Sequence, residues 1–252
     1  IAQYAFYKCN IKNIKLPTNL ISVGDYAFAY NGKSDNNLVD PENWIITPSI
    51  DSLTLNDSIT YIGKYAFANN NLISLDLPTH NKLTLKEYCF INSSNLTEFA
   101  SGENLVIEQG VLNGANKISK LEISSDVSIN NLFGGYVTMV PSSLTEIDII
   151  GDCEVIADSH FAGLGNLEIV RLPSGVKEIG NNAFYGCARL VEVTNINEVK
   201  TIGNSAFYGC NNFDFDNTNT FTNVNYVGYN AFSGTKFMVS STEEFVMINN
   251  VL

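Results

Sequence analysis

Residues Leu167 to Cys187 read L-E-I-V-R-L-P-S-G-V-K-E-I-G-N-N-A-F-Y-G-C, and this stretch decides the fold. Moved forward by about 23 residues, it returns from Leu190 to Cys210 as L-V-E-V-T-N-I-N-E-V-K-T-I-G-N-S-A-F-Y-G-C, with nearly every apolar position kept. A fixed period in the twenties is typical of a solenoid, whose units pack on their neighbours because none can bury its apolar face alone. The chain is therefore interpreted as a repeat array.

The phenylalanine that closes the motif locates the other copies. The motif ends at Phe6, Phe28, Phe67, Phe90, Leu112, Phe161, Phe184, Phe207 and Phe232, with a degenerate copy near Phe133. These positions predict a single leucine-rich-repeat solenoid domain over residues 1–252, with about nine to ten repeats of about 23 residues. Two departures are expected, an insertion at about 31–49 and an irregular coil at about 130–143.

Each unit contains a short strand followed by a return path. Val170 and Leu172 are expected to point inward and Ile169 and Arg171 outward, because strand side chains alternate between faces. Val176, Ile179 and the motif phenylalanine are expected to point into the coil from the return path. Stacked copies then form a parallel, concave sheet in a horseshoe, with short strands and 3-10 or single-turn helices on the return side, such as residues 181–185. Asn195 breaks the pattern, so either Ile196 replaces it inside or its amide bonds a neighbouring coil.

The string I-G-x-x-A-F-x-G-C followed by L-x-x-I-x-L-P resembles the bacterial leucine-rich repeats of the BspA-like, or Treponema pallidum, type. The resemblance covers essentially the whole chain and is strongest around Phe28, Phe67, Phe184 and Phe207. It implies a curved right-handed solenoid on a secreted or surface-attached protein. Adhesive roles toward host matrix proteins or other cells occur among members of this family.

Composition agrees with a secreted scaffold. The 252 residues carry a formal net charge of -12, so the chain lacks the basic surface that nucleic acid or an anionic membrane would require. No apolar run approaches the roughly 20 residues that span a bilayer. Ile1 lies inside a repeat and the last residues stop within a unit, so we expect a fragment or a processed chain.

The chain has five cysteines, which could be free thiols, disulfides or metal ligands. Cys9, Cys187 and Cys210 each follow the motif phenylalanine by three residues, Cys89 occupies the alanine position before Phe90, and Cys153 replaces an inward valine. We expect free buried thiols, since cysteine is among the most buried residue types. A bridge between Cys187 and Cys210 is the alternative, and zinc is disfavoured because no C-x-x-C pair exists.

Catalysis is disfavoured because few bases are available at neutral pH. His80 and His160 lie in different repeats and are expected to be structural or exposed. The acids Asp35, Asp40 and Glu42 lack the spacing of a calcium loop. We therefore expect no catalytic residue, no cofactor and no metal.

A ligand-binding surface is expected on the outward side of the strands, by analogy with the fold. Its candidate residues are Ile169, Arg171, Lys120, Glu122, Glu146, Asp148 and Glu192. A solvated polar face is the alternative explanation for them. Trp44, the single tryptophan, is a further candidate, unless it folds back over neighbouring coils from the insertion.

Tyrosine stands two residues before the motif phenylalanine in the first four copies, at Tyr4, Tyr26, Tyr65 and Tyr88. Lateral packing between successive return paths explains this column, and a recognition stripe on the convex flank is the alternative. Later copies carry serine or asparagine at this position.

The sequence thus predicts a non-enzymatic leucine-rich-repeat protein, extracellular or on the cell surface, that mediates adhesion or binds a macromolecular ligand. Its partner is expected to be a host or cell-surface protein or glycan, not nucleic acid, and the chain a monomer without a membrane-spanning segment. A passive spacer or stalk that presents another domain is the alternative function, and an enzyme is the least favoured.

Overall fold

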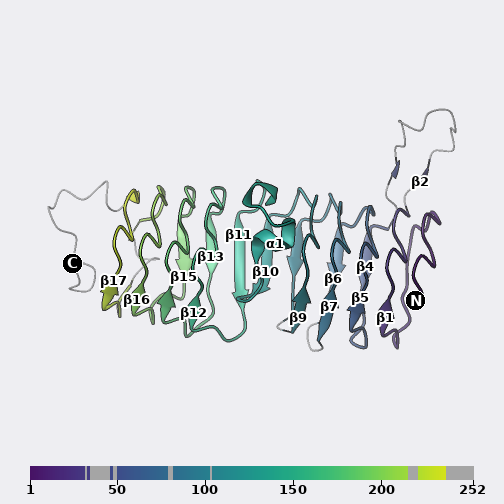
Figure 1. Cartoon of the computed structure of the whole chain (residues 1–252), viewed down its shortest axis with the longest axis horizontal. Coiled ribbons are helices and arrows are strands. Elements are labelled where there is room, and N and C mark those ends of the chain that lie inside the picture. Colours follow the sequence, from purple (N-terminus) through teal and green to yellow (C-terminus); the bar gives the residue numbers. More distant parts are fainter. Residues whose placement is uncertain are drawn as a thin grey trace. The chain divides into compact units, whose positions relative to one another are not determined.

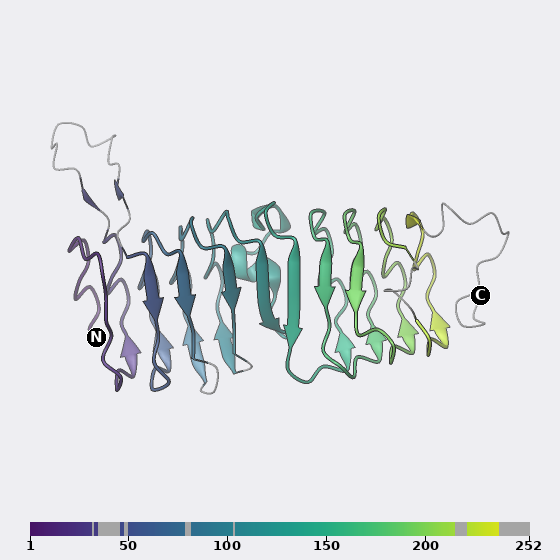
Figure 2. The same cartoon turned by 180° about the vertical axis from the view of Figure 1, so that it is seen from behind.

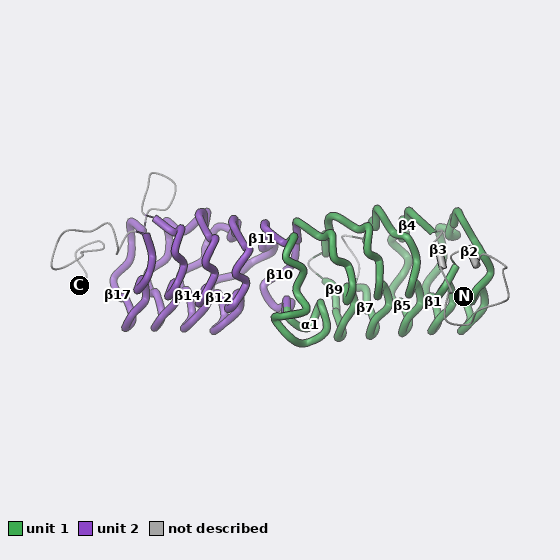
Figure 3. The backbone as a smooth tube through the Cα atoms, turned by 90° about the horizontal axis from the view of Figure 1, so that it is seen from above, with its two compact units in different colours: residues 1–119, 130–143 green, residues 120–129, 144–252 purple. Residues whose placement is uncertain are grey.

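The computed structural model of the chain describes residues 1–31, 33–34, 46–47, 50–78, 82–102, 104–214 and 221–236. Backbone contacts separate the chain into two compact units (Figure 3). Unit 1 comprises residues 1–119 and 130–143, and unit 2 comprises residues 120–129 and 144–252. The organisation as one domain of about nine to ten repeats stays a prediction.

In unit 1, short strands at the same place in successive coils pair in parallel (Figure 1). One sheet contains, in spatial order, β1 (Ser22–Val23), β5 (Tyr61–Ile62), β7 (Leu83–Leu85) and β9 (Leu105–Ile107). A second parallel pairing joins β4 (Ser52–Thr54) to β6 (Ser74–Asp76), and β8 (Glu98–Ala100) follows in the chain. An antiparallel pair, β2 (Lys33–Ser34) and β3 (Ile46–Thr47), lies in the stretch predicted as an insertion.

Unit 2 also has two parallel ladders, which Figure 2 shows from the other side. The first contains β10 (Lys120–Ser124), β11 (Glu146–Ile150), β13 (Ile169–Arg171) and β15 (Glu192–Thr194). The second contains β12 (Val155–Ile156), β14 (Glu178–Ile179), β16 (Thr201–Ile202) and β17 (Tyr226–Val227). Each unit is a stretch of parallel β-solenoid, which confirms the predicted leucine-rich-repeat fold class.

Helix is scarce in the described part of the chain. Apart from Lys236, it is limited to α1 (Ile129–Phe133) and the 3-10 helix η1 (Val137–Met139), both in or next to the stretch predicted as an irregular coil. Neither has the length or the apolar composition needed to cross a bilayer, and the same holds for every helix within the described ranges.

The motif phenylalanines form the core of each unit. In unit 2 the ring of Phe184 stacks on Phe161 at 4.8 Å and on Phe207 at 4.9 Å, and all three are fully buried. Val170, Leu172, Val176 and Ile179 are also buried, as the repeat pattern predicts. Burial of such side chains contributes about 1.5–3 kcal/mol each, which is the main stabilising term for every coil.

Phe6 differs from the other motif phenylalanines. Its ring stacks on Phe28 at 5.0 Å, yet the side chain remains 40% exposed because no described coil covers its other face. The expectation of an inward, covered ring therefore fails at this position.

The return path consists of consecutive turns where a helical turn was expected. The backbone N–H groups of Asn182 and Phe184 donate to Asn204 and Ala206 in the next coil, at 2.9 and 2.7 Å. Tyr185, by contrast, donates within its own coil to Asn182 at 3.0 Å. A helix would direct every N–H back along its own coil. Here every second N–H joins the next coil, so the coils are bonded to one another along the turns as well as along the strands.

This alternation requires left-handed backbone at two positions of each turn. In one coil of unit 2 they are Asn182 at φ 56° and Gly186 at φ 71°, and in one coil of unit 1 they are Tyr65 at φ 53° and Asn69 at φ 55°. Glycine and asparagine adopt this region readily, whereas it costs other residues about 1–2 kcal/mol. The tyrosine column of unit 1 therefore carries backbone strain.

The glycine of the I-G dipeptide is required by close approach of coils. A Cβ added at Gly203 would lie 2.6 Å from the backbone nitrogen of Asn181 in the preceding coil, and one at Gly228 would lie 2.4 Å from that of Asn204. Any side chain at these positions would push the coils apart.

Both alternatives raised for Asn195 are realised together. Ile196 is 1% exposed and takes the inward place, while Asn195 has a φ of 60° and points outward. The side-chain amide of Asn195 donates to the carbonyl of Leu172 in the preceding coil at 2.6 Å. The left-handed residue thus shifts the inward position by one and bonds the neighbouring coil.

Candidate functional site

The parallel register of unit 2 brings seven candidate residues onto one surface. One row across the sheet holds Lys120, Glu146, Ile169 and Glu192, and the next row holds Glu122, Asp148, Arg171 and Thr194. The residues between the rows, such as Leu121 and Val170, are fully buried, whereas those in the rows are partly exposed. We call this outward surface, made of the eight residues in the two rows, the charged strand face.

A network of ion pairs connects its centre. The guanidinium of Arg171 donates through Nη1 to Glu146 Oε2 and to Asp148 Oδ1, both at 2.9 Å. Asp148 also forms an ion pair with the Lys120 ammonium, with 2.9 Å between Nζ and Oδ2. Each exposed ion pair contributes only about 0.2–1 kcal/mol to stability. Because Asp148 pairs with two cations, however, side chains from three strands are held in one arrangement.

The protonation states of this network are set by its hydrogen bonds. Partial burial acts to raise the pKa of Asp148, but the hydrogen bonds from Arg171 and Lys120 outweigh it, so the pKa is lowered from its ordinary value. The hydrogen bond to Asp148 raises the pKa of Lys120. Hydrogen bonds to Asp148 and Glu146 raise the pKa of Arg171. Asp148, Lys120 and Arg171 are therefore charged at neutral pH.

Two carboxylates on the face lie outside the network. Glu122 on β10 and Glu192 on β15 make no ion pair with any described residue, and they are three strands and two residues along the strand, or about 16 Å, apart. Ile169 stands in the first row, between Glu146 and Glu192, as a partly exposed apolar side chain. The face therefore offers two unpaired acids around a fixed polar centre, which favours a partner with basic groups.

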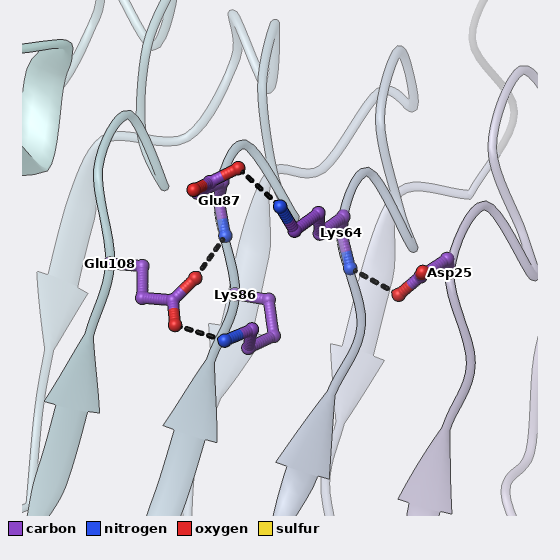
Figure 4. A network of polar contacts seen from close by, with 5 residues as sticks. All are labelled: Asp25, Lys64, Lys86, Glu87 and Glu108. Atoms are coloured by element: carbon purple, nitrogen blue, oxygen red, sulfur yellow. Dashed lines mark hydrogen bonds and ion pairs between the residues drawn. The ribbon is translucent and has the colours of Figure 1, made fainter.

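Unit 1 contains a charged ladder that the sequence reasoning missed (Figure 4). The Lys64 ammonium pairs with Glu87 at 2.8 Å, while the backbone N–H of Lys64 donates to Asp25 at 2.8 Å. In the next coil the Lys86 ammonium pairs with Glu108, which also accepts from the backbone N–H of Glu87 at 3.3 Å. The signal available in the sequence was the repeat position itself, since Asp25, Lys64 and Glu87 all follow the I-G position.

The predicted tyrosine column exists as a stack in unit 1. Rings of Tyr4, Tyr26, Tyr65 and Tyr88 lie parallel at 5.0, 4.9 and 5.3 Å between successive centroids. Tyr4 is half exposed and the other three are partly exposed. Packing between coils is thus directly observed, and recognition by this column stays a prediction.

The cysteines are free thiols. Cys89, Cys153, Cys187 and Cys210 are buried as expected, but Cys9 is exposed, which corrects the prediction for that residue. Cys187 and Cys210 donate to the carbonyls of Phe161 and Phe184, each in the preceding coil, at 3.1 and 3.0 Å. Burial raises the pKa of Cys187 to about 12 and raises that of Cys210 as well.

His160 occupies the position that is alanine in the neighbouring coils, and its ring packs edge-on against Phe161 at 4.6 Å. Its Nε2 atom is buried without a hydrogen-bond partner among the described residues, and burial lowers its pKa. In the described ranges, no group of three His, Cys, Asp or Glu side chains is arranged to hold a metal ion. Trp44, His80 and the acids Asp35, Asp40 and Glu42 lie outside the described residues.

Comparison with known proteins identifies the family. Residues 1–43, 46–136 and 133–246 match the model of the BspA type leucine rich repeat region, in six copies. The chain belongs to the BspA-type leucine-rich repeat family. This confirms the resemblance drawn from the repeated I-G-x-x-A-F motif, and BspA-type repeats account for both units of the chain.

Solved structures of other bacterial leucine-rich repeat proteins are similar to the chain. A protein from Bacteroides ovatus is 18% identical, with 93% of this chain and 80% of that chain covered and a TM-score of 0.34. The T. pallidum leucine rich repeat protein is 21% identical, with 92% and 79% covered and a TM-score of 0.31. A leucine rich cell surface protein from Faecalibacterium prausnitzii is 19% identical, with 92% and 65% covered and a TM-score of 0.29.

Among curated proteins, no sequence matches the chain. The family assignment therefore rests on the repeat model.

Proposed function

We propose that the chain is a secreted or cell-surface protein that binds a macromolecular partner through the charged strand face, without catalysing a reaction. Its membership of the BspA-type family supports both the location and the role as a binding scaffold. The partner that suits this face is a protein with exposed lysine or arginine side chains, and adhesion would follow from such binding.

One observation carries the proposal. Residues that are far apart in the sequence, from Lys120 to Glu192, lie in register on four adjacent strands, and the pairs of Arg171 with Glu146 and Asp148 hold them in place. A surface that is ordered before binding loses little side-chain entropy when a partner docks. The unpaired charges of Glu122 and Glu192 would attract a basic partner and raise its association rate.

The test is a binding screen of the whole chain against immobilised extracellular-matrix proteins, followed by two double variants measured on each binder. E122Q/E192Q removes the two unpaired carboxylates of the face without changing their size. E178Q/E198Q removes the same charge from exposed residues of unit 2 that do not belong to the face. We expect the first variant to slow association and raise Kd by about tenfold, or roughly 1.4 kcal/mol, and the second to change little.

Equal effects of the two variants would contradict the assignment of binding to the charged strand face. A chain that binds none of the matrix proteins would instead favour the alternative of a passive spacer.

A further inference from the structure

Unit 2 exposes a second surface that neither the repeat pattern nor the charged strand face explains. Tyr185 and Tyr208 stand one residue after the motif phenylalanine in adjacent coils, and their rings stack at 5.1 Å with an interplanar angle of 6°. They remain 44% and 38% exposed, respectively. In the next coil the equivalent position is Ser233, while Tyr229, at the repeat position of Asn204, is 78% exposed. Contiguous exposed aromatic side chains, such as this stacked pair, are typical of surfaces that bind a ligand.

A small polar residue shares a turn with each of these tyrosines. The turn hydrogen bonds from Tyr185 N–H to Asn182 and from Tyr208 N–H to Ser205, at 3.0 and 3.1 Å, bring each tyrosine close to the left-handed residue of its own turn. The side chains of Asn182 and Ser205 have no hydrogen-bond partner among the described residues. They therefore offer unused donors and acceptors in the same turn as each tyrosine.

A ladder of amides fixes the orientation of the neighbouring asparagines. Asn181 Oδ1 accepts the backbone N–H of Asn204 at 2.8 Å, and Asn204 Oδ1 accepts that of Tyr229 at 2.8 Å. At one end, the Asp158 carboxylate accepts hydrogen bonds from the side-chain amide of Asn181 at 3.3 and 3.4 Å. Because its oxygen is held by the next coil, the Asn204 amide keeps its N–H groups for a ligand. We call Asn181, Asn182, Tyr185, Asn204, Ser205 and Tyr208 the tyrosine-amide strip.

The strip carries no charge. Residues 179–188, 202–213 and 227–235 contain no Asp, Glu, Lys or Arg, in a chain with a formal net charge of -12. At the corresponding positions unit 1 has the ion-paired ladder of Asp25, Lys64 and Glu87 (Figure 4). The neutral surface is thus confined to these coils of unit 2, since the preceding coil has Asp158 at the position of Asn181, and it is not imposed by the fold.

We propose that the tyrosine-amide strip binds a neutral polysaccharide chain. Tyrosine offers an apolar ring with a hydroxyl group and loses little conformational entropy on binding, while Asn and Ser make adaptable hydrogen bonds. A neutral glycan presents apolar C–H faces and many hydroxyl groups, and it needs no counter-charge. A ligand that bound through ion pairs would find them on the charged strand face instead. Because the two surfaces have different residues and chemistry, this inference does not depend on the proposed function.

The experiment is native affinity electrophoresis of the whole chain in gels that contain dextran, xyloglucan or galactomannan. The wild-type chain is expected to be retarded by at least one of them, with a Kd that does not change between low and high salt, since no charge takes part. The Y185A/Y208A variant should raise that Kd by about tenfold or more, which is the effect of losing aromatic anchors. Y61A, which removes a similarly exposed tyrosine of unit 1, is the matched control and should leave the Kd unchanged.

Circular dichroism reports whether each variant folds. If Y185A/Y208A does not fold, the N182G/S205G variant tests the proposal instead. Glycine accepts the left-handed backbone at both positions, while the amide and the hydroxyl group are lost. The Kd of this variant should also rise by about tenfold. The proposal is overturned if no polysaccharide retards the wild-type chain, if retention disappears in high salt, or if the deciding variant migrates like the wild type. If the deciding variant had a lower melting temperature but the same retention as the wild type, the strip would serve only in packing.

Discussion

Tyr65 stacks its ring on that of Tyr26 at 4.9 Å, and both residues hold left-handed backbone, at φ 53° and φ 54°. The turn geometry requires a positive φ at both residues, and the contacts between the stacked rings offset the free-energy cost of this backbone conformation. An aromatic pair contributes about 0.5–1.5 kcal/mol beyond the area it buries, which is comparable to the cost of the backbone conformation.

The first prediction compares Tyr65→Ala with Tyr65→Gly. Both variants lose the stacking on Tyr26 and Tyr88, but only alanine keeps the left-handed strain. We expect Tyr65→Ala to lower the free energy of unfolding by about 2–4 kcal/mol, and Tyr65→Gly by about 1 kcal/mol less. Urea denaturation measures both. An alanine variant as stable as the glycine variant, or more so, would contradict the backbone conformation.

The second prediction concerns the glycine that lets coils approach. Gly203→Ala places a methyl group 2.6 Å from the backbone of Asn181, and backbone cannot rotate away, so the free energy of unfolding should fall by about 1–3 kcal/mol. Gly165→Ala is the control, since its new methyl group would meet only Gly186 O, at 3.9 Å, and its effect should stay within about 0.5 kcal/mol. If both variants lost a similar amount of unfolding free energy, the close contact between Gly203 and Asn181 would not explain the loss.

The third prediction concerns thiol reactivity. Burial raises the pKa of Cys187 to about 12, so it is a neutral thiol at pH 8, whereas Cys9 is exposed. In the native chain, iodoacetamide at pH 8 should modify Cys9 quickly and leave Cys89, Cys153, Cys187 and Cys210 protected. Mass spectrometry after labelling in the presence and absence of denaturant checks this. Rapid native labelling of Cys187 or Cys210 would contradict their burial.

The fourth prediction is a pH dependence that His160 introduces. Burial lowers its pKa below the ordinary 6.5, with Asp126 acting in the opposite direction. The unfolded chain therefore takes up a proton near pH 6.5 before the folded chain does, and the free energy of unfolding falls as the pH drops below that value. The slope is at most about 1.4 kcal/mol per pH unit and ends at the folded-state pKa.

Substitution isolates this contribution. His160→Ala restores the residue found at this position in the neighbouring coils and removes the buried, unpartnered Nε2 atom. Chemical denaturation between pH 7.5 and 4.5 should show the wild type losing stability relative to the variant from pH 6.5 downward. Parallel curves over that range would contradict the lowered pKa.

The repeat pattern predicted which side chains are buried and which are exposed, because these depend on the alternation of inward and outward positions. Val170, Leu172 and Ile179 are buried as expected, and Lys120 to Glu192 share one face, because a parallel stack in register places equal repeat positions side by side. The pattern does not encode how backbone bonds are divided within a turn. For that reason, residues 181–185 were expected to form a helical turn, although alternate N–H groups bond the next coil.

The candidate site was predictable only in part, for a similar reason. The outward positions could be named from the strand pattern, and Asp148 lies directly opposite Arg171, but the second contact of Arg171, with Glu146, depends on which diagonal a long side chain takes across the strands. Tyr185 and Tyr208 were overlooked because each stands next to a motif phenylalanine, and adjacency in sequence does not reveal that the two rings stack outside the core.

Carboxyl footprinting of the chain with and without a saturating matrix-protein partner tests most directly whether the charged strand face binds. Carbodiimide coupling of a small amine, followed by mass spectrometry, reports the accessibility of each acid. Glu122 and Glu192 should lose reactivity in the complex, while Glu178 and Glu198, which lie elsewhere on unit 2, should keep theirs. Unchanged labelling of Glu122 and Glu192, with protection at Glu178 and Glu198, would show that the partner docks on a different surface.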